Sequence, residues 1–301
     1  MTVGAAPSGL EADGLAKAYG PRTVLGPLDL VVPAGSLIAV VGANGTGKSS
    51  LLGRLAGTTR GPGRVTLAGR EVAPDRQRRV AYLPQRVRLP ASARVGEVLA
   101  LFAALRGPVA DRVHLPDGFL PESGSPVGHL SGGQARRVAL AASLAGAPEL
   151  LLLDEPFANL DDDGRRLTGD LLLAHVRAGA IVMVASPSAV ELLAVADRVL
   201  VLEDGQITLD GPPATYLARM QVSVWMPLDG LPATDHASLA ALPSVLRARR
   251  AGDWMVLDCL EPQTVDVLRA VEARGVPADR IRLTGSGVAG AIGENDAGAG
   301  G

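Results

Sequence analysis

The stretch from Gly42 to Ser49 constrains this chain of 301 residues more than any other part of it. It reads Gly-Ala-Asn-Gly-Thr-Gly-Lys-Ser and follows the apolar run Leu37–Val41, which is typical of a buried strand. Glycines let successive backbone N–H groups curl around a polyphosphate, and a helix beginning near Gly47 directs its positive dipole end at the same oxygens. The sequence therefore predicts a strand, a phosphate loop and a helix, in which Lys48 neutralises phosphates and Ser49 ligates Mg²⁺. The alternative is a glycine-rich turn without a ligand.

Composition and charge argue against several other classes of protein. The net charge of −2 gives no basic footprint for nucleic acid, so we expect no nucleic-acid partner. The single Cys259 excludes an internal disulfide, and the four histidines are too scattered to indicate a metal site. No apolar stretch approaches the roughly 20 residues that span a bilayer, and the N-terminus lacks the pattern of a secretion signal. We expect a cytosolic protein whose membrane role requires a partner.

The alternation of strand-like and helix-like segments predicts a doubly wound α/β core followed by a smaller domain. We expect a nucleotide-binding domain over residues 1–221, with a small helical insert at about 86–147. The pattern changes after residue 221, and residues 222–284 read as a small α+β domain. The glycine-rich end, 285–301, is expected to be disordered.

Two carboxylates end the hydrophobic run that begins at Leu150. Because the carboxyl ends of parallel strands meet at one edge of a sheet, Asp154 is expected beside the phosphate loop, where it can hold Mg²⁺ through water. Glu155 would then point at the γ-phosphate and orient or deprotonate water. Paired acids at a strand end are otherwise ordinary turn formers.

A second anion site is predicted where Leu130 is followed by Ser131-Gly132-Gly133-Gln134 and a helix. A serine cap and two glycines present backbone N–H groups at a helix N-terminus, here without a lysine. A plain N-cap with a flexible approach is the alternative. Two half-sites in one chain indicate head-to-tail dimerisation around a nucleotide.

Taken together, these motifs resemble those of the ATP-binding cassette (ABC) ATPases over about residues 10–220. The Leu-Ser-Gly-Gly-Gln motif, shortly before a Leu-Leu-Leu-Asp-Glu-Pro strand, is specific to that family. The resemblance implies an α/β P-loop NTPase fold of the ABC type, with a β-subdomain, a RecA-like parallel sheet and a helical insert, and ATP with Mg²⁺ as cofactors. Two copies would sandwich ATP. The phosphate-loop residues implied to bind it are Gly42, Ala43, Asn44, Gly45, Thr46, Gly47, Lys48, Ser49 and Ser50; from the second motif they are Ser131, Gly132, Gly133 and Gln134.

Three further residues match family positions. Tyr19 matches the aromatic residue that stacks on adenine, although it could instead pack on the core. Gln85 matches the glutamine that senses Mg²⁺ and the γ-phosphate, beside the surface where a membrane subunit docks. Asp161 matches the loop through which the two ATP sites communicate, with a plain helix cap as the alternative.

The sequence departs from the family at Ser186, which stands where a histidine contacts the γ-phosphate. Serine can donate one hydrogen bond but carries no charge. We therefore expect ATP binding to survive and hydrolysis to be slowed, on the order of a hundredfold by analogy with removing one preorganised donor.

The resemblance implies an ATP-hydrolysing subunit, peripheral on the inner face of the cell membrane, that drives a separate multi-span permease. Its dimer would be a homodimer or a heterodimer with a paralogue. Residues 222–284 resemble C-terminal extensions of ATPases paired with exporters, so export is expected over import; a dimerisation or regulatory role for this domain stays open. The alternative function is an ATP-gated dimerising switch with little turnover. A soluble ABC protein acting on DNA or ribosomes is disfavoured by the single cassette and the lack of a basic patch.

Overall fold

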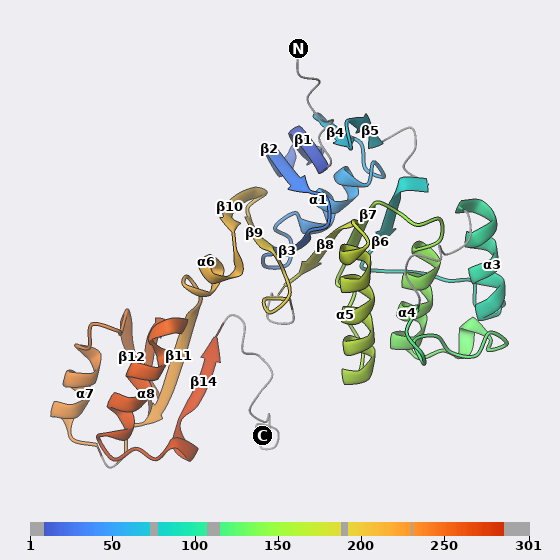
Figure 1. The fold of residues 1–301 in the computed structure, drawn as a ribbon. Coiled ribbons are helices and arrows are strands. Elements are labelled where there is room, and N and C mark those ends of the chain that lie inside the picture. Colours follow the sequence, from blue (N-terminus) through green and yellow to red (C-terminus); the bar gives the residue numbers. More distant parts are fainter. Residues whose placement is uncertain (1–8, 73–77, 107–114, 188–191, 230, 286–301) are drawn as a thin grey trace. The chain divides into compact units, whose positions relative to one another are not determined.

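The structure is a computed structural model that describes residues 9–72, 78–106, 115–187, 192–229 and 231–285 (Figure 1). By its internal contacts the chain divides into two compact units, residues 1–211 and residues 212–301. All but the first residue of the glycine-rich end, expected to be disordered, lie outside the described residues.

A six-stranded sheet forms the centre of the N-terminal unit. The sheet has the order β10-β9-β3-β8-β7-β6; only β10 runs antiparallel to its neighbour. Every residue of β3 and β7 is buried, as expected for central parallel strands covered on both faces. The strands are β3 (Leu37–Val41), β6 (Val80–Leu83), β7 (Leu150–Asp154), β8 (Ile181–Ser186), β9 (Arg198–Glu203) and β10 (Gln206–Gly211).

The N-terminal unit also contains a second, antiparallel sheet of order β2-β1-β4-β5. The helix α1 (Lys48–Leu55) contacts strands of both sheets, and its buried leucines belong to the hydrophobic core that the two sheets share. This sandwiched position fixes the helix that follows the phosphate loop. The strands are β1 (Gly9–Tyr19), β2 (Arg22–Pro33), β4 (Arg64–Leu67) and β5 (Arg70–Glu71).

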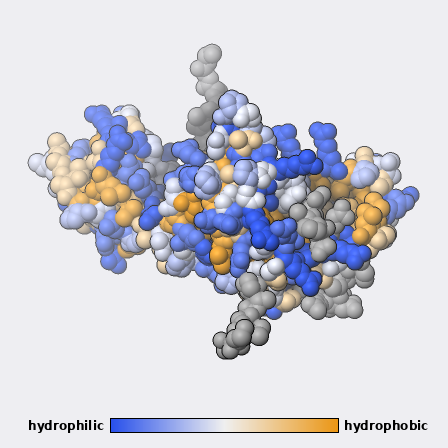
Figure 2. Space-filling view, turned by 90° about the horizontal axis from the view of Figure 1, so that it is seen from above, coloured by the Kyte–Doolittle hydropathy of each residue, from blue (hydrophilic) through white to orange (hydrophobic). Residues whose placement is uncertain are grey.

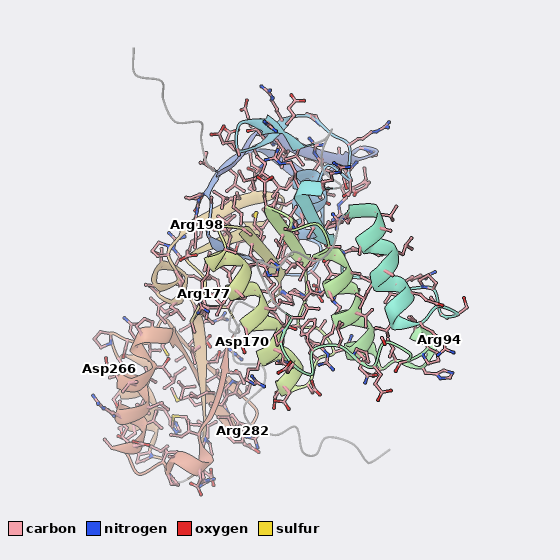
Figure 3. All side chains as sticks on the ribbon, turned by 45° about the vertical axis from the view of Figure 1, so that its right-hand side comes forward. Arg94, Asp170, Arg177, Arg198, Asp266 and Arg282 are labelled. Carbon is pink, nitrogen blue, oxygen red and sulfur yellow. The ribbon has the colours of Figure 1, made fainter. Side chains whose placement is uncertain are left out.

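A helical insert has a separate small core of valines and alanine, with Val95, Val98, Val127, Val138 and Ala142 at its centre. It consists of α3 (Val95–Arg106), a 3₁₀ turn η1 (Val127–His129) and α4 (Gly132–Ser143). The helix α4 also packs on β6, and α5 (Asp162–Arg177) packs on β8 (Figure 1). Arg94, just before α3, lies well away from Arg198 at the start of β9 (Figure 3).

The C-terminal unit has the element order β-α-β-β-α-β after a short first helix, with an antiparallel sheet of order β12-β13-β11-β14. This is the ferredoxin-like arrangement, an α+β fold. Its core contains the lone cysteine, Cys259, which is fully buried. The elements are α6 (Pro213–Leu217), β11 (Gln221–Pro227), α7 (Ala233–Ala240), β12 (Arg247–Ala251), β13 (Trp254–Leu260), η2 (Glu261–Gln263), α8 (Thr264–Glu272), η3 (Ala278–Arg280) and β14 (Arg282–Gly285).

The molecular face in Figure 2 is mainly hydrophilic, and its hydrophobic atoms lie in separate groups. Within the described parts of the chain, no helix is both long and apolar enough to cross a bilayer.

Candidate functional site

The phosphate loop lies between β3 and α1, and glycine is required at both of its ends. A Cβ on Gly42 would collide with the carbonyl of Leu202. At Gly47 the φ angle is 106°, and a Cβ there would lie 2.5 Å from the carbonyl oxygen of Val24. The loop is thus wedged between β2 and β9, and only glycine allows the backbone to pass.

Lys48 is the first residue of α1 and is only 6% exposed. Its Nζ donates to the carbonyls of Gly42 and Ala43, at 2.6 and 2.9 Å, so the ammonium group is folded back over the loop. Burial lowers the pKa of Lys48, and the charges of Asp154 and Glu155 oppose that shift. The positive charge is therefore held at the loop by two carbonyls and two acids.

Asp154 ends β7 and is 2% exposed. Burial raises the pKa of this carboxyl; a hydrogen bond from Ser49 and the charge of Lys48 act in the opposite direction. Its Oδ2 is buried and has no hydrogen-bond partner among the described residues. A buried carboxylate oxygen without a partner next to a serine hydroxyl fits the oxygen donors that Mg²⁺ prefers.

Glu155 follows with a φ of 52°, in the left-handed region that residues with a side chain seldom adopt. Its backbone N–H donates to the carbonyl of Ala185 at 2.8 Å, which ties the turn to β8. Its carboxylate accepts a hydrogen bond from the side-chain amide of Gln85 at 3.0 Å. The structure thus brings Gln85 and Glu155 together, although 70 residues separate them in sequence.

Ser131 caps α4 in a reciprocal capping box with Gln134. The Ser131 hydroxyl accepts from the Gln134 N–H at 3.2 Å, and the Gln134 side chain accepts from the Ser131 N–H at 3.0 Å. A Cβ on Gly133 would lie 2.6 Å from the carbonyl oxygen of Asn159, so the motif packs against the turn after β7. Asp161 caps α5, where it accepts from the Gly164 N–H at 2.8 Å. The serine cap predicted for α4 is present, and Asp161 forms the helix cap that was the alternative interpretation of that residue.

Tyr19 and Ser186 lie at strand ends. Tyr19 ends β1 and is 56% exposed, so it does not pack in the core, and the ammonium group of Lys17 lies 4.5 Å from its ring centroid. Ser186 ends β8 and pairs with Val41, the last residue before the phosphate loop. The sheet therefore places residue 186 directly beside the loop.

One residue of this site was not predicted from the sequence. Arg136, on the second turn of α4, is 8% exposed and donates to main-chain carbonyls at Gln85 and at Glu155. An arginine on an amphipathic helix looks like a solvated residue, and no pattern in the sequence indicates its buried contacts.

Comparison with known proteins agrees with this geometry. Residues 25–158 match the family model described as ABC transporter. The chain is 39% identical over 225 residues to the hemin import ATP-binding protein HmuV of Streptomyces coelicolor, covering 69% of this chain and 79% of that protein. It is 36% identical to the Fe(3+) ions import ATP-binding protein FbpC 1 of Rhodococcus jostii, over 68% of this chain and 62% of that protein. The aliphatic sulfonates import ATP-binding protein SsuB 2 of Pseudomonas aeruginosa is 38% identical, over 66% of this chain and 73% of that protein.

Solved structures show the same fold. An ATP-binding subunit of an ABC transporter superposes with a TM-score of 0.58 at 24% identity, covering 67% of this chain and 89% of that one. An ATP-binding cassette solved as a dimer in a post-hydrolysis state with ADP and Pi superposes with a TM-score of 0.59 at 21% identity. The match covers 68% of this chain and 98% of that one.

The three relatives are named for import, so they do not support the expectation of export. They do establish the class of protein, because the identity to HmuV extends over most of that relative's length. This chain belongs to the ABC transporter family, as one of its ATP-binding ATPase cassettes.

Proposed function

We propose that this chain is the ATP-hydrolysing subunit of a transporter and that it drives a separate membrane-spanning permease. The observation that carries this proposal is the convergence of Lys48, Asp154 and the Gln85–Glu155 pair at the ends of β3 and β7. These groups come from three separate stretches of sequence, and together they supply a cation for the phosphates, a metal ligand and a base.

In the proposed mechanism the phosphates of ATP lie in the loop from Gly42 to Ser50, and Lys48 turns from its two carbonyls to the outer phosphates. Ser49, Asp154 and Gln85 would hold Mg²⁺, which supplies positive charge against the phosphate oxygens. Glu155 orients or deprotonates the attacking water, and the Gln85 amide holds its carboxylate in place.

The exposed ring of Tyr19 is available to stack on adenine. Val24, on the strand that returns from the Tyr19 hairpin, lies against Gly47 of the phosphate loop. The hairpin therefore borders the phosphate loop, which supports a role for Tyr19 in stacking on the adenine of a bound nucleotide.

The helix N-terminus at Ser131 has no basic residue in its first turn. It therefore presents backbone N–H groups but completes a phosphate site only if the lysine comes from elsewhere. A second copy of the chain, placed head to tail, supplies it. The proposed dimer holds each ATP between the phosphate loop of one protomer and Ser131 to Gln134 of its partner, with Asp161 in the loop that links the two sites.

A cavity of about 580 Å³ adjoins Gln85 and supports docking of the membrane partner there. It is lined by Gln85, Arg86, Arg88, Arg136 and Asn159, among others. A segment inserted here would contact the loop that holds Gln85 and so act on Glu155. The direction of transport is set by the membrane partner, and relatives named for import give export no support.

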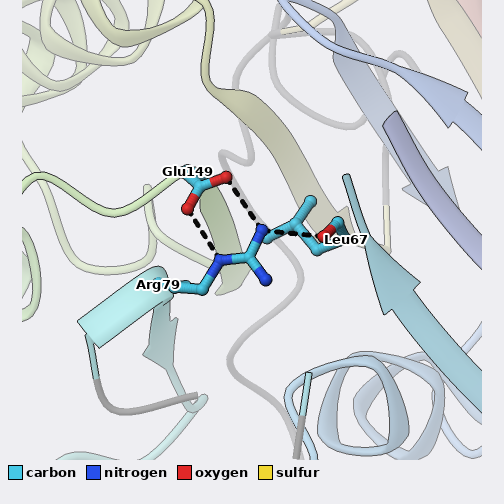
Figure 4. A network of polar contacts seen from close by, with 3 residues as sticks. All are labelled: Leu67, Arg79 and Glu149. Atoms are coloured by element: carbon cyan, nitrogen blue, oxygen red, sulfur yellow. Dashed lines mark hydrogen bonds and ion pairs between the residues drawn. The ribbon is translucent and has the colours of Figure 1, made fainter. Parts of the chain in front are cut away.

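Steady-state ATPase measurements on Glu155→Gln test the proposal. We expect turnover to fall by a hundredfold or more while ATP affinity, measured by equilibrium dialysis with Mg²⁺, stays within about threefold. Glu149→Gln is the matched control, because Glu149 precedes the same strand at its opposite end and is paired with Arg79 at 2.7 and 2.9 Å (Figure 4). If Glu155→Gln hydrolyses ATP as fast as the wild type, the proposal is wrong.

Ser186 favours a second candidate function, an ATP-gated switch that dimerises but seldom hydrolyses. It stands beside the phosphate loop without an imidazole to donate to the γ-phosphate. If the wild type binds ATP and dimerises but shows no turnover above background even with its membrane partner, the switch is the correct description.

A further inference from the structure

Arg136 makes four hydrogen bonds to main-chain carbonyls on two different elements. Its Nη1 donates to the carbonyls of Pro84 and Gln85 at 2.9 and 2.8 Å. Its Nη2 donates to the carbonyl of Glu155 at 3.1 Å and also to that of Asp154. One guanidinium group therefore fastens the loop that carries Gln85 to the strand end that carries Glu155.

This fork-shaped arrangement needs arginine. The planar guanidinium group presents its donors in fixed directions, so it can satisfy two pairs of carbonyls at once, whereas an ammonium group is a point charge. Burial lowers the pKa of Arg136, and the nearby charges of Asp154 and Glu155 oppose that shift. A buried cation kept beside two acids, but bonded to backbone rather than to their carboxylates, leaves those carboxylates available to ligands.

Arg136 also belongs to the helix that Ser131 caps. The guanidinium group extends from the second turn of α4, and the capping box fixes the first turn of that helix through Gln134. A displacement of the α4 N-terminus is therefore transmitted to the carbonyls at Gln85 and Glu155 through a single side chain.

We propose that Arg136 is a positioning residue that couples the two ATP sites of the dimer. This rests on the proposed function, in which Ser131 of one protomer contacts the nucleotide held by its partner. Engagement of Ser131 by the partner's ATP fixes α4, and Arg136 then sets the Gln85–Glu155 pair of its own protomer for attack. Hydrolysis in one site thus depends on occupancy of the other.

The test compares Arg136→Lys with Arg106→Lys in the full-length chain. Arg106 is a matched control: it is a partly buried arginine that donates to the carbonyls of Ser143 and Val80, at the opposite ends of α4 and β6, and burial also lowers its pKa. For Arg136→Lys we expect kcat to fall at least tenfold, the Kd for ATP to change less than threefold, and the Hill coefficient for ATP to fall toward one. For Arg106→Lys we expect kcat within about twofold of the wild type and an unchanged Hill coefficient.

Arg136→Gln serves as a second variant, because its amide keeps two donors and no charge. Equal losses of kcat in the Arg136 and Arg106 variants, or an unchanged Hill coefficient in both Arg136 variants, would overturn the proposal. So would failure of both Arg136 variants to fold while Arg106→Lys folds, since Arg136 would then serve the fold alone. The turnover of the wild type and of Glu155→Gln is measured in parallel. If turnover is lost in Glu155→Gln, the proposed function stands, whether or not Arg136 couples the two sites.

Discussion

At the residue scale, the buried carboxyl of Asp154 makes stability depend on pH. Because burial raises its pKa, the folded protein binds a proton here more tightly than the unfolded chain does, and the ionised form destabilises the fold at neutral pH. We expect Asp154→Asn to raise the free energy of unfolding of the nucleotide-free protein at pH 7. The gain should shrink as the pH falls through the raised pKa of this carboxyl, because the wild type then becomes protonated as well.

Urea unfolding at several pH values measures this difference, and a variant less stable than the wild type at pH 7 would contradict it. Adding ATP with Mg²⁺ gives an internal check. The ligand should stabilise the wild type more than Asp154→Asn, because the variant lacks a carboxylate for the metal.

The replacement Ser186→His tests the departure from the family. Residue 186 lies beside the last residue before the phosphate loop, so an imidazole there can reach toward the γ-phosphate. We expect kcat to rise by about 10- to 100-fold with little change in the affinity for ATP, because the added donor acts mainly in the transition state. If Ser186→His shows equal or lower turnover in steady-state ATPase assays, Ser186 does not limit hydrolysis.

At the element scale, the central strand β7 sets the position of both acids. Leu152 is fully buried between the sheet's two covering layers, so Leu152→Ala is expected to lower the free energy of unfolding by about 2–5 kcal/mol. Leu101→Ala on α3 is the control, because that side chain is 54% exposed and should cost little. Denaturant unfolding followed by far-UV circular dichroism compares the two variants. If both lose the same free energy of unfolding, burial of Leu152 in β7 does not stabilise the core as proposed.

Most elements were predictable because their signals are local. The strand before the phosphate loop, the serine and aspartate caps and the all-apolar β7 each follow from a few adjacent residues. The apolar spacing at 189–196 predicts a helix, and this prediction is wrong where it can be compared. Residues 188–191 lie outside the described parts of the chain, and residues 192–195 form a turn. Apolar residues spaced every three or four also suit a turn that packs on the core, as the buried Leu192 does.

The contacts that complete the site were not predictable in the same way. The hydrogen bond between Gln85 and Glu155 joins residues 70 apart, and the hydrogen bond from Arg136 to Gln85 spans 51 residues. Only the pairing of β6 with β7 and the packing of α4 on β6 bring these groups together. Gln85 was expected at the site from the family resemblance, whereas Arg136 has no such signal.

At the scale of the whole molecule, the two compact units predict two separable unfolding events. Both tryptophans of the chain, Trp225 and Trp254, lie in the C-terminal unit, so their fluorescence reports that unit alone. We expect ATP with Mg²⁺ to stabilise the N-terminal unit, by about 2.7 kcal/mol at a hundred times Kd, and to raise the circular-dichroism midpoint. The fluorescence midpoint should stay unchanged. A shift of both midpoints together would mean that the units unfold as one.

The central claim is that two copies of this chain clasp ATP between the phosphate loop of one and Ser131 of the other. The most direct test is the mass of Glu155→Gln in solution, measured by light scattering, because this variant should bind ATP and hold it. With ATP and Mg²⁺ the mass should double from 30.8 kDa. When Lys48→Ala or Ser131→Arg is added to the Glu155→Gln variant, the mass should remain at 30.8 kDa with ATP and Mg²⁺ present. A mass that nucleotide does not change would contradict the account.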